Sequence, residues 1–342
     1  MKAYIRAFGN ISPQHSLDPE LFYRQQIKPV KDSFECIEPD YSHFVDSKMI
    51  RRMSRIVKMG VAAALTCLKN GAVENPAAII TATAYGCLED SSSFLRRMIE
   101  FNETMLSPTA FIQSTHNTVG AQIALLVKSN SYNNTIVHRD FSFENALTES
   151  MLLLQESAGP LLVGAIDEIT NDSHTILRRF GLYKQTRTDS KTVTGNIAGE
   201  GAAFFLLDKE ATPDCVCSLK AVRTRYGLIN VRQETESFLQ SNQMTMKNID
   251  LVLTGHPGDT ARDVPDDLLL KSVFKNTQCF PFKSLCGDYP TATGFALWFA
   301  CLLLKEQKAP QWMTGIRFPL QNILIHNHSG DVRNSFLLIG AC

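Results

Sequence analysis

Short apolar stretches alternate along the chain with longer segments of helical periodicity. In residues 47–70, apolar side chains recur close to every 3.6 residues, which predicts an amphipathic helix that ends at Asn70-Gly71. The apolar run of residues 77–85 follows and has the length of a buried strand. Alternation of this kind predicts an α/β protein with a buried, mostly parallel sheet.

The same alternation continues to the end of the sequence. Further helices are predicted over residues 90–103, 116–129, 142–157, 232–242 and 291–307. Further strands are predicted over residues 2–8, 135–138, 160–168, 199–210, 216–227, 249–255, 321–327 and 334–341. The proline-containing stretch 11–46 and the polar stretch 170–198 are predicted to be irregular. Two successive α/β halves, 1–210 and 211–342, are therefore expected.

Composition narrows the range of functions. The chain has 342 residues, of which 44% are hydrophobic and 20% charged, and this is typical of a globular protein. Lys+Arg and Asp+Glu both number 34, so the zero net charge does not favour a nucleic-acid partner. The longest apolar stretch, residues 294–304, is too short to span a bilayer. Because the start of the sequence also lacks the apolar core of a signal peptide, we expect a cytoplasmic protein with no membrane span.

The nine cysteines show no metal-binding spacing, and no metal or cofactor is predicted. Several lie in apolar runs, so we interpret the cysteines as mainly buried, reduced thiols. Cys215 and Cys217 are too close in the sequence to form an ordinary disulfide with each other.

A sharp turn between strand 135–138 and helix 142–157 is the first place where chemistry could occur. It reads His138-Arg139-Asp140-Phe141-Ser142, and such strand-to-helix turns expose the nucleophile in many α/β enzymes. Asp140 is a poor acyl nucleophile when ionised. We therefore favour helix capping by Asp140 or Ser142 over catalysis on local grounds.

Three other segments attract attention. His256 follows a strand, where α/β folds place ligand-binding residues, although a lone histidine is more often structural. Lys283 and Asp288 precede an apolar helix and could form a simple ion pair. The small residues 291–294 at the start of that helix permit either close packing or backbone approach to a ligand. The Gly-Glu-Gly of residues 199–201 opens a strand, so it is no dinucleotide-binding fingerprint.

Seven segments, taken in order, resemble the β-ketoacyl synthase family of the thiolase-like fold. They are RRMSRIVKMGVAAAL, AAIITATAYGCLED, STHNTVGAQIALL, PLLVGAIDEIT, GEGAAFFLLDKE, TGHPGDTARD and FKSLCGDYPTATGFA. The resemblance spans nearly the whole chain. It implies a five-layered α-β-α-β-α fold with two similar halves, and a dimer in which strand 135–138 lies near the two-fold axis.

The residues expected at the family's active site are partly replaced. Aligned without gaps, Asp140 stands where the family has its acyl-accepting Cys, and Asp288 stands where it has its second His. His256 matches the first His, and Lys283 matches the Lys. Phe143 stands where a small elbow Gly is usual.

His138, Phe141 and Phe143 are the expected elbow or acyl-pocket residues. Condensation needs a thiolate that accepts the acyl group and imidazoles that stabilise an enolate. Two anionic Asp side chains would repel an enolate. The sequence therefore assigns no catalytic residue with certainty.

The resemblance leaves two functions open. The first is a non-condensing subunit of the chain-length-factor type, which pairs with an active ketosynthase in fatty acid, polyketide or aryl-polyene biosynthesis. The alternative is an acyltransferase or malonyl-carrier decarboxylase that uses His256 and Lys283 without a covalent intermediate. A homodimeric lipid-binding protein is a third, weaker idea. The implied partners are an acyl carrier protein and a second subunit, either the same chain or a ketosynthase.

Overall fold

The computed structural model describes residues 2–30, 32–104, 106–156, 159–184, 195–256, 273–275, 277–330 and 332–342. Hydrogen bonds join neighbouring strands in the order β3-β2-β4-β5-β1-β6-β10-β9-β7-β8. The strands are β1 (Ala3–Ile11), β2 (Ala78–Ala82), β3 (Tyr132–Ile136), β4 (Leu161–Asp167), β5 (Gly201–Asp208), β6 (Cys217–Tyr226), β7 (Leu251–Thr254), β8 (Gln278–Pro281), β9 (Asn322–Ser329) and β10 (Arg333–Ala341).

The strand order repeats itself, although no repeat is visible in residue identity. The first five strands of the chain are arranged 3-2-4-5-1, and the last five, counted from β6, take the same order. In each set the first three strands of this order are parallel to one another, and each of the next two is antiparallel to the strand before it. The set β1–β5 is called the first sheet below, and the set β6–β10 the second sheet. The sets meet through β1 and β6, which pair only over Ala3–Ile5 and Cys217–Leu219.

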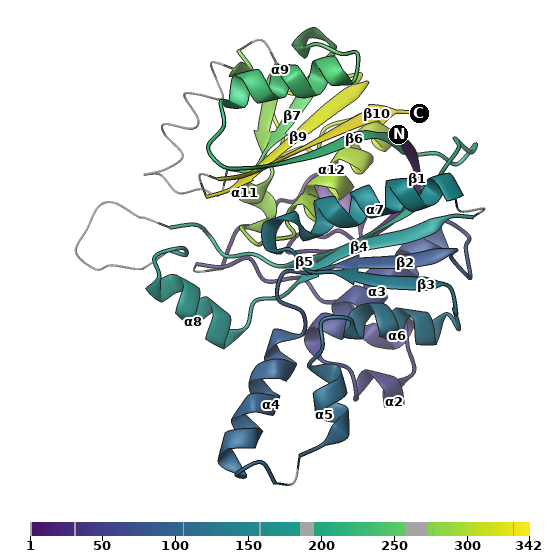
Figure 1. The fold of residues 1–342 in the computed structure, drawn as a ribbon. Coiled ribbons are helices and arrows are strands. Elements are labelled where there is room, and N and C mark those ends of the chain that lie inside the picture. Colours follow the sequence, from purple (N-terminus) through teal and green to yellow (C-terminus); the bar gives the residue numbers. More distant parts are fainter. Residues whose placement is uncertain are drawn as a thin grey trace.

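The helices complete five layers. They are α1 (Pro19–Arg24), α2 (Ser47–Ile50), α3 (Arg55–Asn70), α4 (Leu88–Glu100), α5 (Pro108–Gln113), α6 (Thr118–Leu126), α7 (Ser142–Glu156), α8 (Asn171–Arg179), α9 (Val231–Ser241), α11 (Lys283–Cys286) and α12 (Thr293–Glu306). Figure 1 shows α7 and α12 between the two sheets, α3 and α6 beneath the first sheet, and α9 above the second. The largest apolar cluster joins α7 and α12 to strands of both sheets. This arrangement confirms the α/β, five-layered thiolase-like fold.

The central position of α12 explains its sequence. Its residues 293–304 are all buried, because a helix between two sheets has no solvent-facing side. The small residues at its start serve packing: a Cβ on Gly294 would lie 2.9 Å from the Cβ of Ala165 on β4. Just before the helix, Thr291 donates a 2.8 Å hydrogen bond to the buried carboxylate of Asp167. Of the two interpretations of this segment, close packing therefore accounts for it.

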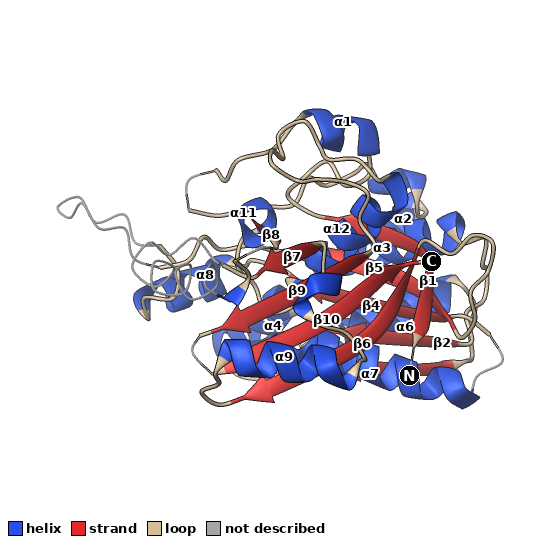
Figure 2. Cartoon of the chain, turned by 90° about the horizontal axis from the view of Figure 1, so that it is seen from above, coloured by secondary structure: helices blue, strands red, loops and turns tan. Residues whose placement is uncertain are grey.

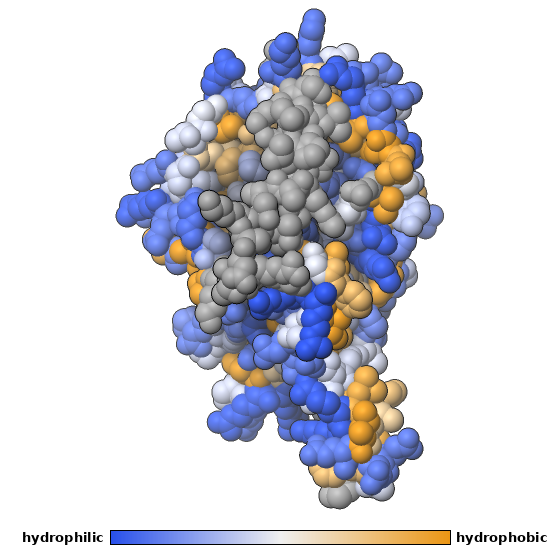
Figure 3. Space-filling view, turned by 90° about the vertical axis from the view of Figure 1, so that its left-hand side faces the viewer, coloured by the Kyte–Doolittle hydropathy of each residue, from blue (hydrophilic) through white to orange (hydrophobic). Residues whose placement is uncertain are grey.

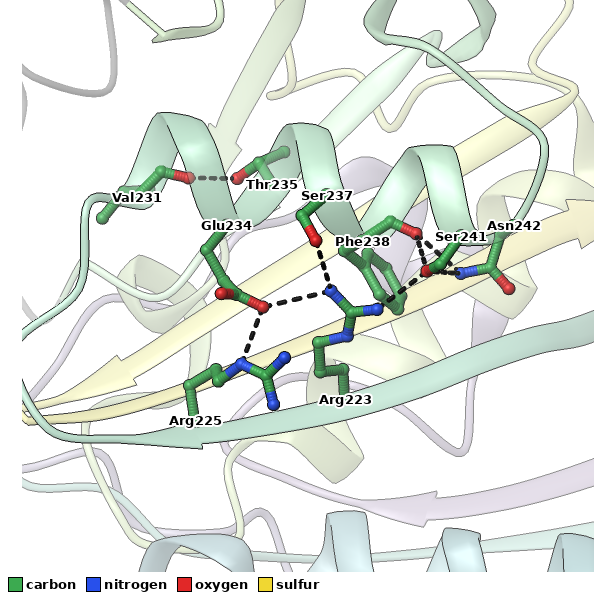
Figure 4. A network of polar contacts seen from close by, with 9 residues as sticks. All are labelled: Arg223, Arg225, Val231, Glu234, Thr235, Ser237, Phe238, Ser241 and Asn242. Carbon is green, nitrogen blue, oxygen red and sulfur yellow. Dashed lines mark hydrogen bonds and ion pairs between the residues drawn. The ribbon is translucent and has the colours of Figure 1, made fainter.

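Helix α9 is held on the outer face of β6 by polar contacts as well as apolar ones. Arg223 and Arg225 both donate to Oε1 of Glu234, at 3.1 and 2.8 Å, and Figure 4 shows their guanidinium groups pointing toward the helix. Arg223 also donates to the hydroxyl of Ser241 at 2.7 Å and stacks over Phe238. In Figure 2, α9 lies along the strands of the second sheet.

The Gly-Glu-Gly segment contains a buried ion pair. Glu200 is fully buried and accepts two hydrogen bonds from Arg55 at the start of α3, at 2.6 and 2.5 Å. The backbone N–H groups of Cys36 and Ile169 also donate to this carboxylate. Glu200 therefore fixes three distant segments to one another.

Several elements differ from the sequence prediction. The helix expected over 47–70 is interrupted at residues 51–54, and Ser54 occupies the N-cap position of a new helix, α3. The stretch predicted to be irregular at 170–198 contains α8, whose capping box between Thr170 and Ser173 is a local start signal. Helices α1 and α5 and strand β8 were not predicted either. In each case the element is short, so its periodicity is weak.

The prediction that the cysteines are buried, reduced thiols was wrong for Cys215, Cys342 and Cys279. Cys215 and Cys342 form a disulfide with a Cα–Cα distance of 6.1 Å, and Cys279 is exposed. The pairing follows from strand register, which brings together residues that are 127 positions apart. The six remaining cysteines are buried thiols, as expected. Within the described residues, none of the helices has the length and apolar character that a membrane crossing requires.

Candidate functional site

A strained turn joins β3 to α7. Arg139 has a φ of +49°, which is unusual for a residue with a side chain and marks a tightly held conformation. The hydroxyl of Ser142 holds the turn, because it accepts a 2.7 Å hydrogen bond from the N–H of His138 and donates one to the carbonyl of Arg139. The turn places Asp140 between these residues, in a short 3-10 helix (Arg139–Phe141).

Among the described residues, no backbone N–H of α7 donates to the carboxylate of Asp140, so the helix-capping interpretation was wrong for this residue. Its carboxylate lies 3.3 Å from the guanidinium of Arg333, the first residue of β10. Its side chain is 16% exposed, and that of Arg333 is 27% exposed. A residue of the N-terminal half is thus ion-paired to the C-terminal half, a contact that capping rules cannot anticipate.

The three expected elbow residues lie in different surroundings. His138 shares a 2.7 Å hydrogen bond with Asn145, and its ring meets the edge of Phe141. Phe141 is buried. Phe143 is fully buried and packs against Phe205 of β5, within the central apolar layer. Its ring therefore fills space between the sheets.

Lys283 and Asp288 form the ion pair that sequence reasoning considered. The ammonium of Lys283 lies 2.8 Å from Oδ1 of Asp288 and donates a 3.0 Å hydrogen bond to the carbonyl of His328. Lys283 is 2% exposed. The second carboxylate oxygen of Asp288 accepts from the side-chain amide of Asn196. Both charges are thus compensated within the protein.

Two glycines allow the backbone segments around Asp288 to meet. A Cβ on Gly199 would lie 2.0 Å from the carbonyl oxygen of Cys286. Gly287 has a φ of +75°, and a Cβ there would lie 2.5 Å from the carbonyl oxygen of Ala198. The approach lets Gly199 donate to the carbonyl of Asp288 at 3.0 Å. The first of these glycines belongs to the Gly-Glu-Gly segment, so this segment positions Asp288.

His256 is part of a cluster of histidines that sequence reasoning missed. Its ring centroid lies 5.4 Å from that of His328 on β9, and His326, two residues earlier on the same strand, stacks 6.0 Å from His328. Burial, followed by the charge of Lys283, lowers the pKa of His328 well below its ordinary value. Burial also lowers the pKa of His326 to about 4. Both imidazoles are therefore neutral near pH 7.

A signal for this cluster was present in the sequence. Residues two apart on a strand point to the same side of the sheet, and His326 and His328 have that spacing. Their proximity to His256 depends on the pairing of β7 with β9, and this pairing could not be predicted from the sequence.

Asp140 and Asp288 lie in one region of the structure, because both act on the same side chain, Tyr183. Burial raises the pKa of Tyr183, and the negative charges of Asp288 and Asp140 raise it further. In the β9–β10 ladder, Arg333 pairs with Ser329, the neighbour of His328. Asp140 is thus joined through Arg333 to the strand that carries the histidines. The part of the predicted segment 254–263 that follows His256 lies outside the described residues.

The sequence predicted two uncompensated carboxylates that would repel an enolate, and this prediction was wrong. Asp140 is paired with Arg333, and Asp288 is paired with Lys283. Because each carboxylate has a cation within hydrogen-bond range, the region holds two ion pairs and neutral imidazoles.

Glu144 in the first turn of α7 is a further buried carboxyl near this region. Its Oε1 accepts 2.7 Å hydrogen bonds from Ser335 of β10 and Thr293 of α12, and Thr293 in turn accepts from Asn327 of β9. Burial raises the pKa of Glu144 to about 7, against the lowering effect of the two hydroxyl donors. The network links the elbow helix to three elements of the other half.

Comparison with known proteins agrees with this geometry. Residues 26–180 match the family model of the β-ketoacyl synthase N-terminal domain. No curated protein matches the chain. A solved structure described as the ishigamide ketosynthase/chain length factor has a TM-score of 0.78 at 14% identity, and the match covers 100% of this chain and 99% of that chain.

Two other solved structures give similar values. A β-ketoacyl synthase from Burkholderia phymatum STM815 has a TM-score of 0.78 at 13% identity, with 100% of this chain and 99% of that chain covered. The ketosynthase ApeO in complex with its chain length factor ApeC, from Xenorhabdus doucetiae, has a TM-score of 0.72 at 14% identity, with coverage of 99% and 98%.

The fold places the chain in the thiolase-like class. Within that class, residues 26–180 resemble the β-ketoacyl synthase N-terminal domain, whose family model they match, and the whole chain resembles ketosynthases and chain length factors in fold.

Proposed function

We propose that this protein is a non-condensing subunit of the chain-length-factor type, which pairs with an active ketosynthase in polyketide, fatty acid or aryl-polyene biosynthesis. The observation that carries the proposal is the ion pair between Asp140 and Arg333 at the position that matches the family's nucleophile. A carboxylate held by a guanidinium is a weak nucleophile, and an acyl group on it would form only a labile anhydride. Such a subunit would not hold a growing chain covalently.

The departure at the second family position supports the same proposal. Asp288 replaces an imidazole and is bound to Lys283, so neither group is available to stabilise an enolate oxygen in the way the family's site requires. The role left to the subunit is to shape the space that receives the acyl chain on its partner. An acyl carrier protein would deliver that chain; one of the similar structures is described as an acyl-carrier protein in complex with its ketosynthase.

The first sheet offers a surface for the second subunit. Strand β3 is an edge strand, so its outer backbone groups are available for pairing with another chain. Next to it, α6 exposes Leu125 at 71%, and a hollow of about 390 Å³ lies between the segment 49–57 and helices α5 and α6. Helices α4 and α5 form a projecting lobe with apolar side chains on its surface, seen at the bottom of Figure 3. We propose that this face contacts the partner.

Co-expression tests the pairing. The chain is co-expressed with the products of its neighbouring genes, and any complex with a ketosynthase is isolated through a tag on the chain. We expect a stable heterodimer by light scattering and loss of most of it in Leu125→Glu. The matched control is Leu228→Glu, because Leu228 is 83% exposed but lies beyond the second sheet. A stable monomer in the presence of the ketosynthase, or equal loss in both variants, would contradict the proposal.

Intact-mass spectrometry tests the absence of a covalent intermediate. The isolated chain is incubated with acyl and malonyl carrier proteins, and an active ketosynthase serves as the positive control. We expect no acyl adduct on the chain. A stable adduct that maps to Asp140 or to a neighbouring residue would contradict the non-condensing assignment.

A second candidate function is decarboxylation of a carrier-bound malonyl group. The observation in its favour is that His328 lies beside His256, so the region keeps two imidazoles although the family's second His is replaced. In this reaction the bond to the carboxylate carbon breaks, CO2 leaves, and the electron pair forms an enolate that an imidazole N–H can bind before the α-carbon takes up a proton. Conversion of malonyl to acetyl carrier protein by the isolated chain, lost in both His256→Ala and His328→Ala, would favour this candidate.

A further inference from the structure

Four of the nine cysteines form a cluster in the C-terminal half, away from the candidate site. Cys215 lies in the segment between β5 and β6, Cys217 opens β6, Cys301 lies on α12, and Cys342 follows β10. The last ladder pair of β6 and β10 is Cys217 with Ala341. Residues 215 and 342 therefore extend just beyond the end of an antiparallel ladder.

The outer pair of the cluster is a disulfide near the surface. The Cα atoms of Cys215 and Cys342 are 6.1 Å apart, within the usual range for a disulfide, and Cys342 is exposed while Cys215 is half-buried. Small thiols can therefore reach the bond. Exposed disulfides of this kind are the ones that are most readily reduced and re-formed.

The inner pair differs in chemistry. The Sγ atoms of Cys217 and Cys301 lie 3.2 Å apart without a bond, and both residues are fully buried. Burial raises the pKa of Cys301 well above that of an ordinary thiol, so its reactive thiolate is scarce. The cluster thus combines one accessible disulfide with two protected thiols.

We propose that Cys215 and Cys342 are a reversible redox-modification site that clips the end of β10 to the start of the C-terminal half. The reductant is a low-molecular-weight dithiol or glutathione-type thiol. Reduction breaks the S–S bond, each sulfur takes up a proton, and the two thiols of the reductant join in a disulfide. The reverse exchange with an oxidised thiol restores the clip.

The clip has a structural consequence because of its span. It closes a loop with a sequence separation of 127, which contains β6 to β10. Closing a loop of this length restricts the unfolded chain and so favours the folded C-terminal half. The other end of β10 begins with Arg333, which holds Asp140. The redox state of the clip thus acts on a strand that reaches the candidate site.

Thiol counting on the full chain tests the proposal. The protein is equilibrated with oxidised glutathione or with dithiothreitol, denatured, alkylated and weighed. We expect seven alkylated cysteines after oxidation and nine after reduction, with a 215–342 cross-linked peptide only in the oxidised sample. Nine alkylated cysteines in both samples, or a cross-link between other cysteines, would overturn the proposal.

Thermal unfolding provides the second measurement. Reduction should lower the apparent Tm by about 5 °C in the wild type. This difference should disappear in Cys215→Ser and in Cys342→Ser and persist in Cys279→Ser, which changes an exposed cysteine outside the cluster. A redox-independent Tm in the wild type, or an undiminished shift in Cys342→Ser, would show that the pair does not act as a clip.

Discussion

Replacing Glu144 with Gln should change how the stability of the protein depends on pH. Glu144 is fully buried, and two hydroxyl groups, of Ser335 and Thr293, donate to one of its carboxylate oxygens. Its other oxygen, Oε2, has no hydrogen-bond partner within the described residues. The glutamine variant keeps the accepting oxygen and removes the titration.

The magnitude follows from the pKa. Burial raises the pKa of Glu144 from 4.5 to about 7 in the folded protein. A group whose folded pKa is raised binds its proton more tightly when folded, so it lowers stability progressively as pH rises from about 4.5 to 7. At about 1.4 kcal/mol per pKa unit, the wild type should lose on the order of 3 kcal/mol across this interval. The variant should not share this loss.

Urea unfolding curves at pH 5, 6, 7 and 8 measure the effect, with fluorescence and circular dichroism recorded together as a check of cooperativity. We expect the stability of Glu144→Gln relative to the wild type to rise with pH and to level off above pH 7. Glu156→Gln is the control, because Glu156 is exposed at the end of the same helix. A relative stability that stays constant between pH 5 and 8 would refute the raised pKa and its assignment to burial.

Three further outcomes are expected. Arg55→Ala should lower the free energy of unfolding, measured by urea unfolding, by about 3–5 kcal/mol, because it leaves the buried carboxylate of Glu200 without a cation. Arg96→Ala, at an exposed ion pair, should change it by less than about 1 kcal/mol. Arg223→Ala should lower it by about 1–3 kcal/mol, measured by urea unfolding, because the contacts that fasten α9 are lost. Asp140→Cys should not give a condensing enzyme in an assay with acyl and malonyl carrier proteins; an efficient synthase would disprove the importance given to the second replaced position.

The layered fold was predictable because it rests on patterns that act locally. The most deeply buried strands of the first sheet are nearly continuous apolar runs, as in Ala78–Ala82 and Leu161–Asp167, and the amphipathic helix α3 shows its periodicity. Helix α12 is apolar on all sides, which already indicates a central position. Shorter elements such as α8 depend on a cap and a few contacts, so the polarity of the surrounding sequence concealed them.

The contents of the candidate site were only partly predictable. Lys283 and Asp288 are five residues apart, and sequence reasoning could weigh their ion pair. The partner of Asp140, by contrast, lies in another half of the chain, and no local rule selects Arg333. The disulfide between Cys215 and Cys342 has the same origin, because it depends on the register of β6 and β10. The division into halves at 210/211 stays a prediction.

Asp140 and Asp288, the two positions that the sequence comparison matches to the family's Cys and second His, share one physical property that bears on the proposed function. Here each position holds a carboxylate that is joined to a cation from another element, Arg333 of β10 for Asp140 and Lys283 of α11 for Asp288. Such pairs hold segments in place, and they leave neither carboxylate free to act as a nucleophile. The replacements therefore support a subunit that keeps the shape of a ketosynthase and supplies geometry to a partner, with the chemistry of condensation left to that partner.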